Sequence, residues 1–343
     1  MPSRTAVTIA DVAKAANVSA ATVSFVLNNT KAITPEVRAR VETAVKKLSY
    51  QPSHMAKALR TGKTATLGLL IPDLTNPYFP KLAQDIERAA SKAGYAMLFA
   101  DSHDDAATQQ KALRHLENRG VDMILVVPVV GTDDELKSHV PLVVLDRSAG
   151  AMSVKSDEFL GGQQASKHLL ELGHKRFAIL AGPQNNGQPG QRVQGMMSAI
   201  AEAGLRIKLE NLIFSDYSAE SGRTGMKQLL ETAESFTGIL ATSDTLALGA
   251  LSALQSAGLQ VPNDFSLVGF DDIPWAALSY PPLTSVRQDT ATLASQAIEI
   301  ALHLHKYGLE SSVKSKLVKT ELMIRASSAK PTKTPWKRAK GTS

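Results

Sequence analysis

The spacing of apolar residues changes once along the chain. Between positions 8 and 48, apolar residues recur every three or four positions, as at Ile9, Val12, Ala13 and Ala16, which is the period of an amphipathic helix. From about position 65, short apolar runs such as TLGLLIPD alternate with longer helical stretches. The pattern predicts an all-α head followed by a larger α/β body.

Three short helices are predicted in the head. Thr8 can cap the first helix, and Asp11, three residues later, completes a capping box. Ser19 can cap the second helix, and Thr34 followed by Pro35 is a typical start for the third. The tight turn between the first two helices is typical of a helix-turn-helix unit.

The second helix is expected to present small residues on its outer face and to turn Val23, Val26 and Leu27 inward. Small side chains let a recognition helix approach base edges in the major groove, and an aromatic ring can contact a thymine methyl group. The alternative for the ring is a place in the core of the head. The outward set is Ala20, Ala21, Thr22, Ser24 and the aromatic Phe25.

The body is predicted to contain parallel sheets, because short apolar strands separated by helices are covered on both faces. Its length favours two doubly wound units over one. Strands are expected at TLGLLIPD, AMLFAD, VDMILVVPVV, PLVVLDRS, RFAILAGP, NLIFSD, GILATSD and FSLVGFDD. Helices are expected between most of them, for example at 78–93, 105–118, 159–172, 189–203, 220–232 and 245–257.

Polar side chains follow many of these strands directly. Ligands of doubly wound sheets bind outside the carboxyl ends of the strands, so these residues are expected to line a cleft. Carboxylates, guanidinium groups, an amide and two rings suit a neutral polyhydroxyl ligand, which takes directional hydrogen bonds and stacks its C–H face on a ring. The alternative is structural, since an Asp after a strand often caps a helix, as Asp73 and Asp244 could.

Charge is unevenly distributed along the chain. Residues 1–63 hold ten Lys and Arg against three Asp and Glu, and residues 330–343 hold five Lys and Arg and no acid. The whole chain carries +6, so the two segments with +7 and +5 leave −6 on the residues between them. A basic head on an acidic body predicts a polyanion partner such as double-stranded DNA, with a solubilising surface as the alternative.

Several classes of protein are disfavoured. Cysteine is absent, so neither disulfides nor thiolate metal sites are expected. The N-terminus lacks a signal-peptide core and no run approaches the roughly 20 apolar residues of a membrane span, which favours a cytoplasmic protein without membrane contact. No complete phosphate loop is present, and His303 and His305 lie on different helical faces. We expect no enzyme activity, cofactor or metal, although a spatial Ser-His-Asp relay leaves no sequence pattern.

Two long segments, VTIADVAKAANVSAATVSFVLNN and ITPEVRARVETAVKKLSYQPSHMAKALRTGKTATLGLLIPD, closely resemble the LacI/GalR family of bacterial transcription regulators. The resemblance extends from about Thr8 to about Ser327. It implies a homodimeric repressor, most often of carbohydrate-metabolism genes, that binds a pseudo-palindromic operator. It also implies a body of the periplasmic sugar-binding fold holding a small effector, which either releases DNA or promotes DNA binding.

The resemblance assigns DNA contacts to the head and to the hinge after it. Family members most often have arginine at the position of Phe25, so a different operator sequence is expected. The matching hinge segment in the family folds on the operator, where Leu59 would wedge into the minor groove while Met55 and Ala56 pack against the partner hinge. The expected DNA contacts are Thr8, Ser19, Ala20, Ala21, Thr22, Ser24, Phe25, Asn28, Met55, Ala56 and Leu59.

The resemblance also narrows the effector site. The segment LTNPYF resembles the sugar-stacking part of ribose-type binders, and polar residues after later strands match their polar contacts. Ser243 departs from the pattern, because asparagine usually precedes the Asp of this motif, so the sugar is open and a purine or nucleoside is the alternative. The expected effector contacts are Asn76, Tyr78, Phe79, Asp101, Asp146, Arg147, Asp157, Arg192, Tyr217, Ser243, Asp271, Trp275 and Gln288.

We therefore predict a multidomain chain. It has an all-α three-helix helix-turn-helix head and an α/β core of two doubly wound, periplasmic-binding-protein-like subdomains. The predicted ranges are 1–50 for the head, 51–63 for the hinge helix, 64–161 with 290–317 for the N-subdomain that dimerises, 162–289 with 318–329 for the C-subdomain, and 330–343 for a disordered basic tail.

Overall fold

The computed structural model describes residues 7–51, 63–132, 136–146, 152–184, 190–232, 235–308 and 314–332. The chain divides into two compact units, Met1–Thr64 and Ala65–Ser343. We refer to them as the head and the body. Each is described by itself.

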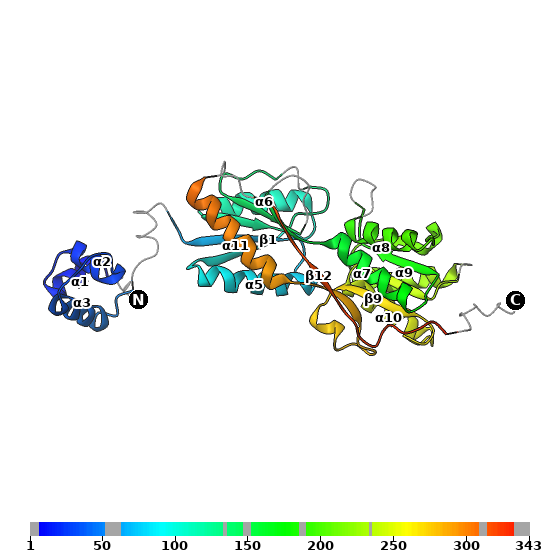
Figure 1. Ribbon diagram of the computed structural model, residues 1–343. Helices are drawn as coiled ribbons and strands as arrows, with labels where there is room; N and C mark the ends of the chain where they lie inside the picture. Colours follow the sequence, from blue (N-terminus) through cyan, green and yellow to red (C-terminus); the bar gives the residue numbers. More distant parts are fainter. Residues whose placement is uncertain are drawn as a thin grey trace, which may run out of the picture. The chain divides into compact units, whose positions relative to one another are not determined.

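The head is a three-helix unit, as predicted (Figure 1). Its helices are α1 (Ile9–Ala16), α2 (Ala20–Asn28) and α3 (Pro35–Lys47). Thr8 and Asp11 form the predicted capping box, in which the Thr8 backbone N–H donates to the Asp11 carboxylate at 2.8 Å. Ser19 caps α2, and its hydroxyl accepts from the Thr22 backbone N–H at 3.1 Å. These caps fix where both helices of the helix-turn-helix begin.

The core of the head is small and made of short side chains. Phe25 is not part of this core and is only partly buried. The prediction for Leu27 was wrong, because its side chain is 36% exposed and does not point inward. The buried residues are Val12, Ala13, Ala16, Val23, Val26, Val41 and Ala44.

The body contains two six-stranded sheets in one compact unit (Figure 1). Sheet A is entirely parallel, in the order β11-β5-β4-β3-β1-β2. Its strands are β1 (Thr66–Ile71), β2 (Ala96–Asp101), β3 (Met123–Val126), β4 (Leu142–Leu145), β5 (Ser153–Ser156) and β11 (Lys316–Val318).

Sheet B has the order β12-β10-β9-β8-β6-β7 and is parallel except at one edge, where β12 runs antiparallel to β10. Its strands are β6 (Phe177–Ala181), β7 (Leu212–Phe214), β8 (Gly238–Ala241), β9 (Ser266–Asp271), β10 (Thr284–Gln288) and β12 (Thr320–Met323). Two doubly wound sheets confirm the predicted fold class. The pattern did not predict β5, β10, β11 and β12, because these short strands contain polar residues and lack an apolar run.

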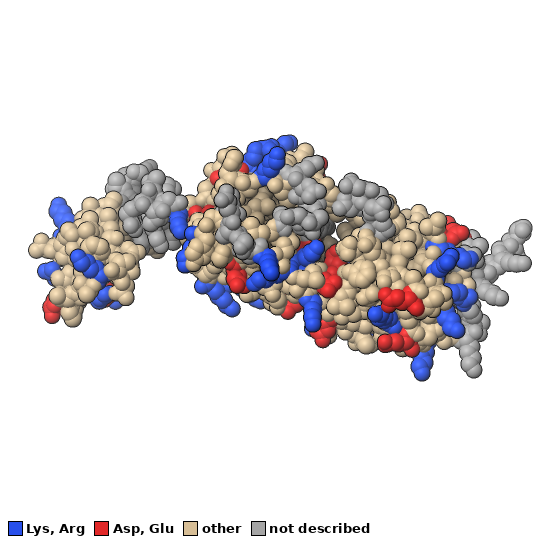
Figure 2. All heavy atoms as spheres, turned by 45° about the horizontal axis from the view of Figure 1, so that its top comes forward, with Lys and Arg blue, Asp and Glu red and all other residues tan. Residues whose placement is uncertain are grey.

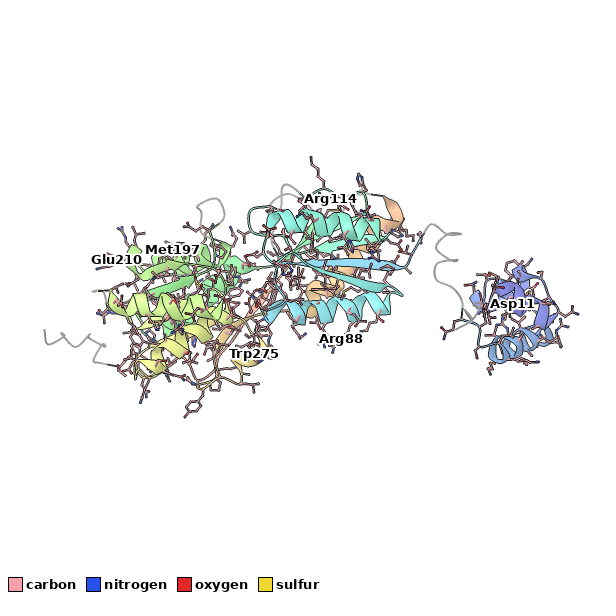
Figure 3. All side chains as sticks on the ribbon, turned by 180° about the vertical axis from the view of Figure 1, so that it is seen from behind. Asp11, Arg88, Arg114, Met197, Glu210 and Trp275 are labelled. Carbon is pink, nitrogen blue, oxygen red and sulfur yellow. The ribbon has the colours of Figure 1, made fainter. Side chains whose placement is uncertain are left out.

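Helices cover the faces of both sheets. Arg88 on α5 and Arg114 on α6 point to opposite sides of the body, because these two helices lie on opposite faces of sheet A (Figure 3). The six predicted helices agree with the structure to within two residues at each end. The helices are α5 (Tyr78–Lys92), α6 (Ala106–Asn118), α7 (Glu158–Glu171), α8 (Gln191–Glu202), α9 (Ala219–Glu231), α10 (Asp244–Ser256) and α11 (Thr290–Tyr307).

The chain passes between the two sheets three times. It crosses after β5, returns after β10 and crosses again between β11 and β12. Helix α11 packs on α5 and on the strands of sheet A, whereas α7 packs on α8 and on sheet B. We refer to sheet A with its helices as lobe A, and to sheet B with its helices as lobe B.

No described helix is by itself both long and apolar enough to span a bilayer. Only α1 and α2 taken together, across a bend of 100°, reach the length and composition of a span.

Candidate functional site

The outer side of α2 carries small residues, as predicted for a recognition helix. Ala20 and Ala21 are exposed, and Ser24 is partly buried. The Asn28 side-chain amide donates to the Ser24 backbone carbonyl at 2.8 Å, which steadies the last turn. The side chains on this part of the helix are therefore short and leave its backbone approachable.

Phe25 stands beside this surface with a cation over its ring. The Lys31 ammonium lies 5.5 Å from the centre of the Phe25 ring, within reach of a cation–π interaction. Figure 2 shows Lys and Arg side chains on the head, which carries six cationic and three acidic residues between positions 7 and 51. The pair can offer an apolar face to a thymine methyl group and a positive charge to a phosphate.

Four predicted contacts lie outside the described residues. They are Met55, Ala56 and Leu59 of the hinge, and Arg147 after β4.

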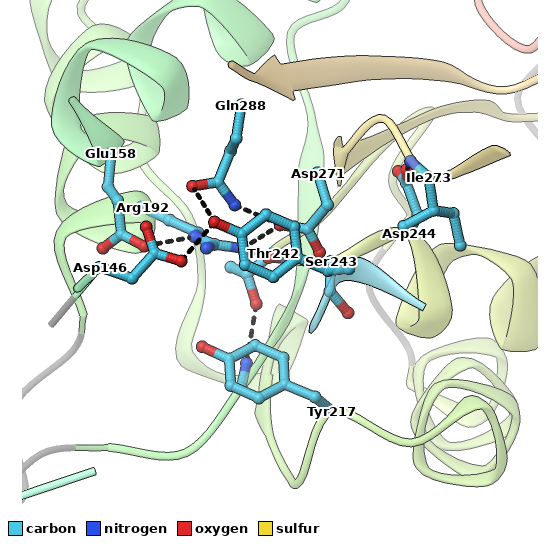
Figure 4. Close-up of polar contacts among 12 residues, drawn as sticks. Asp146, Glu158, Arg192, Tyr217, Thr242, Ser243, Asp244, Asp271, Ile273 and Gln288 are labelled. Carbon is cyan, nitrogen blue, oxygen red and sulfur yellow. Dashed lines mark hydrogen bonds and ion pairs between the residues drawn. The ribbon is translucent and has the colours of Figure 1, made fainter. Parts of the chain in front are cut away.

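The central site of the body joins the two lobes through buried polar groups (Figure 4). Tyr78, at the start of α5 in lobe A, donates its hydroxyl to Asp146, which follows β4 in the same lobe. The Tyr78 hydroxyl also lies 3.4 Å from the Gln288 side-chain carbonyl of lobe B. Burial and the neighbouring Asp146 raise the pKa of Tyr78 well above its usual value, so its hydroxyl keeps its proton and remains a donor.

Arg192, in the first turn of α8, makes most of the contacts in the part of the network that belongs to lobe B. Its Nε donates to Glu158 at 2.8 Å, and its Nη1 donates to the Asp271 carboxylate at 2.9 Å and to the Thr242 backbone carbonyl at 2.7 Å. The guanidinium also lies 4.1 Å from the centre of the Phe270 ring. Burial alone would lower the pKa of Arg192, but the two carboxylates outweigh it and raise the pKa well above its usual value.

Asp271, the last residue of β9, completes the network. Its Oδ1 also accepts from the Gln288 side-chain amide at 2.7 Å. Its backbone has a φ of 106°, a conformation that costs energy for a residue with a side chain and is retained where the surroundings enforce it. Burial raises the pKa of the Asp271 carboxyl to about 6, although Arg192 and Gln288 act to lower it.

Close backbone contact between α7 and α8 sets the position of the Glu158–Arg192 pair. A Cβ atom on Gly162 would lie 2.1 Å from the Arg192 backbone carbonyl oxygen, and one on Gly195 would lie 2.0 Å from that of Phe159. Only glycine allows the two helices to approach this closely. The two glycines therefore bring the acid of one helix onto the guanidinium of the other.

Sequence reasoning missed two members of the network, Glu158 and Thr242. Thr242 directly follows β8, so the strand-end rule would have found it, and its hydroxyl accepts from the Gly182 backbone N–H at 2.8 Å. Glu158 follows β5, a strand that was not predicted.

Four predicted effector contacts accept hydrogen bonds from backbone N–H groups. The Asn76 side chain accepts from the Tyr78 backbone N–H at 3.1 Å, and the Asp101 carboxylate accepts from Leu74 at 3.0 Å and His103 at 2.7 Å. Asp157 is the N-cap of α7 and Ser243 the N-cap of α10. Their structural roles explain their positions and leave their part in ligand binding a prediction.

The predicted aromatic residues occupy different surroundings. Phe79 is buried in the apolar core and meets the Tyr78 ring edge-on. The Tyr217 ring lies against Gly182, where a Cβ atom would come within 2.2 Å of the ring. Trp275 is 55% exposed on the surface of lobe B (Figure 3).

Asp244 is buried next to the site, where its carboxylate accepts from the Ile273 backbone N–H at 2.8 Å.

A cavity of about 210 Å³ adjoins the network on the side of the crossing from β10 to α11. It is lined from both lobes. The lining residues are Tyr78, Lys81, Asp271, Asp272, Ile273, Arg287, Gln288, Asp289, Thr290 and Ala291. Carboxylates, a guanidinium and an amide at one meeting point can bind several hydroxyl or N–H groups of a small ligand. Within the described ranges, no group of three or more His, Cys, Asp or Glu residues is placed to hold a metal ion.

Two family models match the chain. The model of bacterial regulatory proteins of the lacI family covers residues 8–53, and a periplasmic binding protein-like domain covers residues 166–328.

Curated relatives match most of the length. The chain is 35% identical over 302 residues to the HTH-type transcriptional repressor PurR of Haemophilus influenzae (strain PittEE), which covers 86% of this chain and 90% of that protein. It is 33% identical over 301 residues to the ribose operon repressor of Haemophilus influenzae (strain ATCC 51907 / DSM 11121 / KW20 / Rd), covering 86% and 91%.

Among solved structures, the lac repressor dimer bound to operator and the anti-inducer ONPF is similar. The match has a TM-score of 0.83 and 26% identity, and it covers 94% of this chain and 99% of that one.

Proposed function

Because the chain belongs to the lacI family of bacterial regulatory proteins, we propose that it is a DNA-binding transcriptional repressor whose operator affinity is controlled by a small effector. The observation that supports control by an effector is the buried polar network between the lobes. Tyr78 and Asp146 of lobe A meet Gln288, Asp271 and Arg192 of lobe B. A ligand that inserts into this network changes how the two lobes close.

A small sugar or sugar derivative, such as a pentose or hexose, is the favoured effector. The network offers acceptors on Asp146 and Asp271 and donors on Tyr78 and Arg192, which suit adjacent hydroxyl groups. The ribose operon repressor is among the relatives that cover most of the chain. The regulated genes would then serve carbohydrate metabolism.

A purine or nucleoside is the second candidate. The observation that favours it is the identity of 35% with the PurR repressor over most of both chains. Tyr217, whose ring lies against Gly182 in lobe B, supplies a face for stacking a base. In this case the effector would promote operator binding and act as a corepressor.

The head and hinge form the proposed DNA interface. The outer face of α2, with Ala20, Ala21, Ser24 and Phe25, would lie in the major groove. Thr8, Ser19, Thr22 and Asn28 cap or steady α1 and α2 and would hold backbone N–H groups toward phosphates. In the hinge at 51–63, Leu59 would wedge into the minor groove while Met55 and Ala56 pack against a second copy.

Two copies of the chain would present two heads to a pseudo-palindromic operator. Lobe A, the predicted N-subdomain, would supply most of the contact between copies. The predicted subdomain ranges are 64–161 with 290–317 and 162–289 with 318–329. The edge strand β2 supports this assignment, because Leu98 and Phe99 expose more than a third of their surfaces there. Covering an apolar sheet edge with a second copy removes it from water.

The mechanism couples lobe closure to the hinge. An effector that binds one arrangement of the lobes more tightly shifts the population toward that arrangement. The free energy of the shift equals the difference between the effector's binding free energies for the two arrangements. The two hinge segments of the dimer then lie closer together or farther apart, which favours or disfavours their folding on the operator. The protein would act in the bacterial cytoplasm, where operator and metabolites are both present.

The test measures DNA and ligand binding on the same preparations. The full chain should bind a selected duplex more tightly than random DNA, with a Kd that changes when a sugar or purine from a metabolite panel is added. A variant lacking residues 1–62 should lose DNA binding and retain ligand binding, measured as a rise in melting temperature. A full chain that prefers no duplex, with or without any metabolite, would refute the proposal.

A further inference from the structure

Three carboxylates and one guanidinium meet in the network between the lobes (Figure 4). Arg192 is bound by Glu158 and by Asp271. Asp146 lies in the same network through Tyr78. The side chains of Arg192 and Asp271 are only 13% and 4% exposed, so solvent screens these charges poorly.

Among the described residues, three cations near the network form ion pairs with carboxylates outside it. They cannot therefore be counted as spare positive charge for the site. The groups are Lys81 with Asp85, and Arg287 and Arg325 with Asp272 and Glu321.

Arg147 follows Asp146 directly and lies outside the described residues. Even when its charge is added to that of Arg192, three carboxylates outnumber two cations. The network is therefore short of positive charge. A ligand that brings O–H or N–H donors, or an ammonium group, fits this imbalance, whereas a ligand that brings a carboxylate or phosphate adds to it.

We infer that the cleft selects its effector by charge, accepting neutral donor-rich molecules and amine-bearing cations and rejecting anions, with Glu158 as a specificity-determining residue. The inference rests on the proposed function and narrows its ligand class. Sugars, amino sugars, purine bases and nucleosides remain, whereas sugar acids, sugar phosphates and nucleotides are excluded.

Glu158 has this role because it is bound to the Arg192 guanidinium, the group to which an anion would bind. A guanidinium binds carboxylates and phosphates through paired N–H groups. Glu158 occupies the Nε of Arg192, and Asp271 with the Thr242 carbonyl occupies Nη1. An anion that binds Arg192 through a pair of N–H groups must therefore compete with Glu158 at Nε, or with Asp271 and the Thr242 carbonyl at Nη1. Without the Glu158 charge, that edge of Arg192 becomes available.

The experiment is isothermal titration of the full chain with probes that share a skeleton and differ in charge. The sets are D-glucose, D-glucosamine and D-glucuronate; D-ribose and D-ribose 5-phosphate; and adenosine and AMP. For each skeleton that binds, the anionic form should bind at least about tenfold more weakly than its neutral parent, since a further like charge is poorly screened there.

Variants assign the selectivity to Glu158. Glu158→Gln keeps the shape of the side chain and removes its charge. The gap, meaning the ratio of the Kd of the anionic probe to the Kd of its neutral parent, should become about tenfold smaller. Glu158→Asp should retain the gap. Glu171→Gln removes the same charge from an exposed position on the same helix and should also retain it. The ratio of two affinities reports selectivity, which a general loss of stability would not change.

Each outcome bears on a different part of the inference. An anionic probe that binds wild type as tightly as its neutral parent overturns the inference and leaves the proposed function intact. An unchanged gap in a folded Glu158→Gln protein overturns the role of Glu158. A wild-type protein that binds none of the probes overturns both this inference and the effector part of the proposed function.

Discussion

Arg192 and Asp271 are joined by a 2.9 Å contact between Nη1 and Oδ1, although 79 positions separate them in the chain. The contact links the first turn of α8 to the end of β9. It brings a buried cation and a buried acid to the point where lobe B faces lobe A. Three predictions concern this contact or the packing that produces it.

Asp271→Asn should weaken effector binding. The substitution removes a charged acceptor and leaves Arg192 without one of its two carboxylates. We expect a loss of about 1.5–3 kcal/mol in binding free energy, measured by titration with the metabolite that most raises the melting temperature. Glu210→Gln, on the exposed periphery of lobe B, is the control and should bind normally (Figure 3). Equal affinities for wild type and Asp271→Asn would place the ligand elsewhere.

The same carboxyl should make stability depend on pH. Burial raises the pKa of Asp271 to about 6, above its ordinary value of 3.8. Between these pH values the folded protein holds a proton that the unfolded chain has lost, so stability from this group is present at low pH and declines as pH rises through 6. The decline amounts to about 3 kcal/mol at most.

The measurement is the free energy of unfolding by urea for wild type and Asp271→Asn at steps from pH 4 to pH 8. Groups common to both proteins cancel in the difference. Wild type should lose stability relative to the variant as pH rises, and the difference should level off above pH 7. A difference that stays constant over this range would mean that Asp271 titrates at its ordinary pKa.

Gly162→Ala should disrupt the helix pair that positions Glu158 on Arg192. The added Cβ atom would lie 2.1 Å from a backbone carbonyl oxygen, which cannot move aside as a flexible side chain can. We expect a loss of about 1–3 kcal/mol in stability by urea denaturation, together with weaker effector binding. Gly190→Ala is the control, because its Cβ would meet nothing within 4 Å; it replaces the N-cap of α8 by a poorer one, should cost no more than about 1 kcal/mol, and should leave effector binding unchanged. Similar losses in both variants would contradict the packing argument.

Phe25→Arg should change which operator the head prefers. An arginine forms paired hydrogen bonds with guanine, whereas the ring can offer only apolar contact to a thymine methyl group. Selection from a random duplex library should therefore yield a different base pair at one position of each half-site. Lys31→Gln should instead weaken binding to all duplexes alike and reduce the slope against salt by about one. An unchanged selected sequence for Phe25→Arg would mean that the ring does not face the DNA.

Local order is readable from the sequence because helices, caps and strands depend on neighbouring residues. Apolar periodicity placed the three head helices, Thr8 and Ser19 marked the starts of the first two, and alternating apolar runs predicted two doubly wound sheets. The rule that polar residues at strand ends meet in a cleft predicted that Asp146, Asp271 and Gln288 lie together, and all three belong to the network.

The tertiary structure decided which of these polar residues touch one another. Hydrogen bonds at about 3 Å depend on how helices and strands pack, and spacing along the chain does not encode that. Asp157 and Ser243 cap helices, Asp101 binds the backbone of the loop after β1, and Trp275 lies at the surface. Glu158 reaches Arg192 because two glycines let α7 and α8 come into contact. The sequence by itself therefore determined the elements and the edge where the site lies, whereas the pairing of its charges arose only from long-range packing.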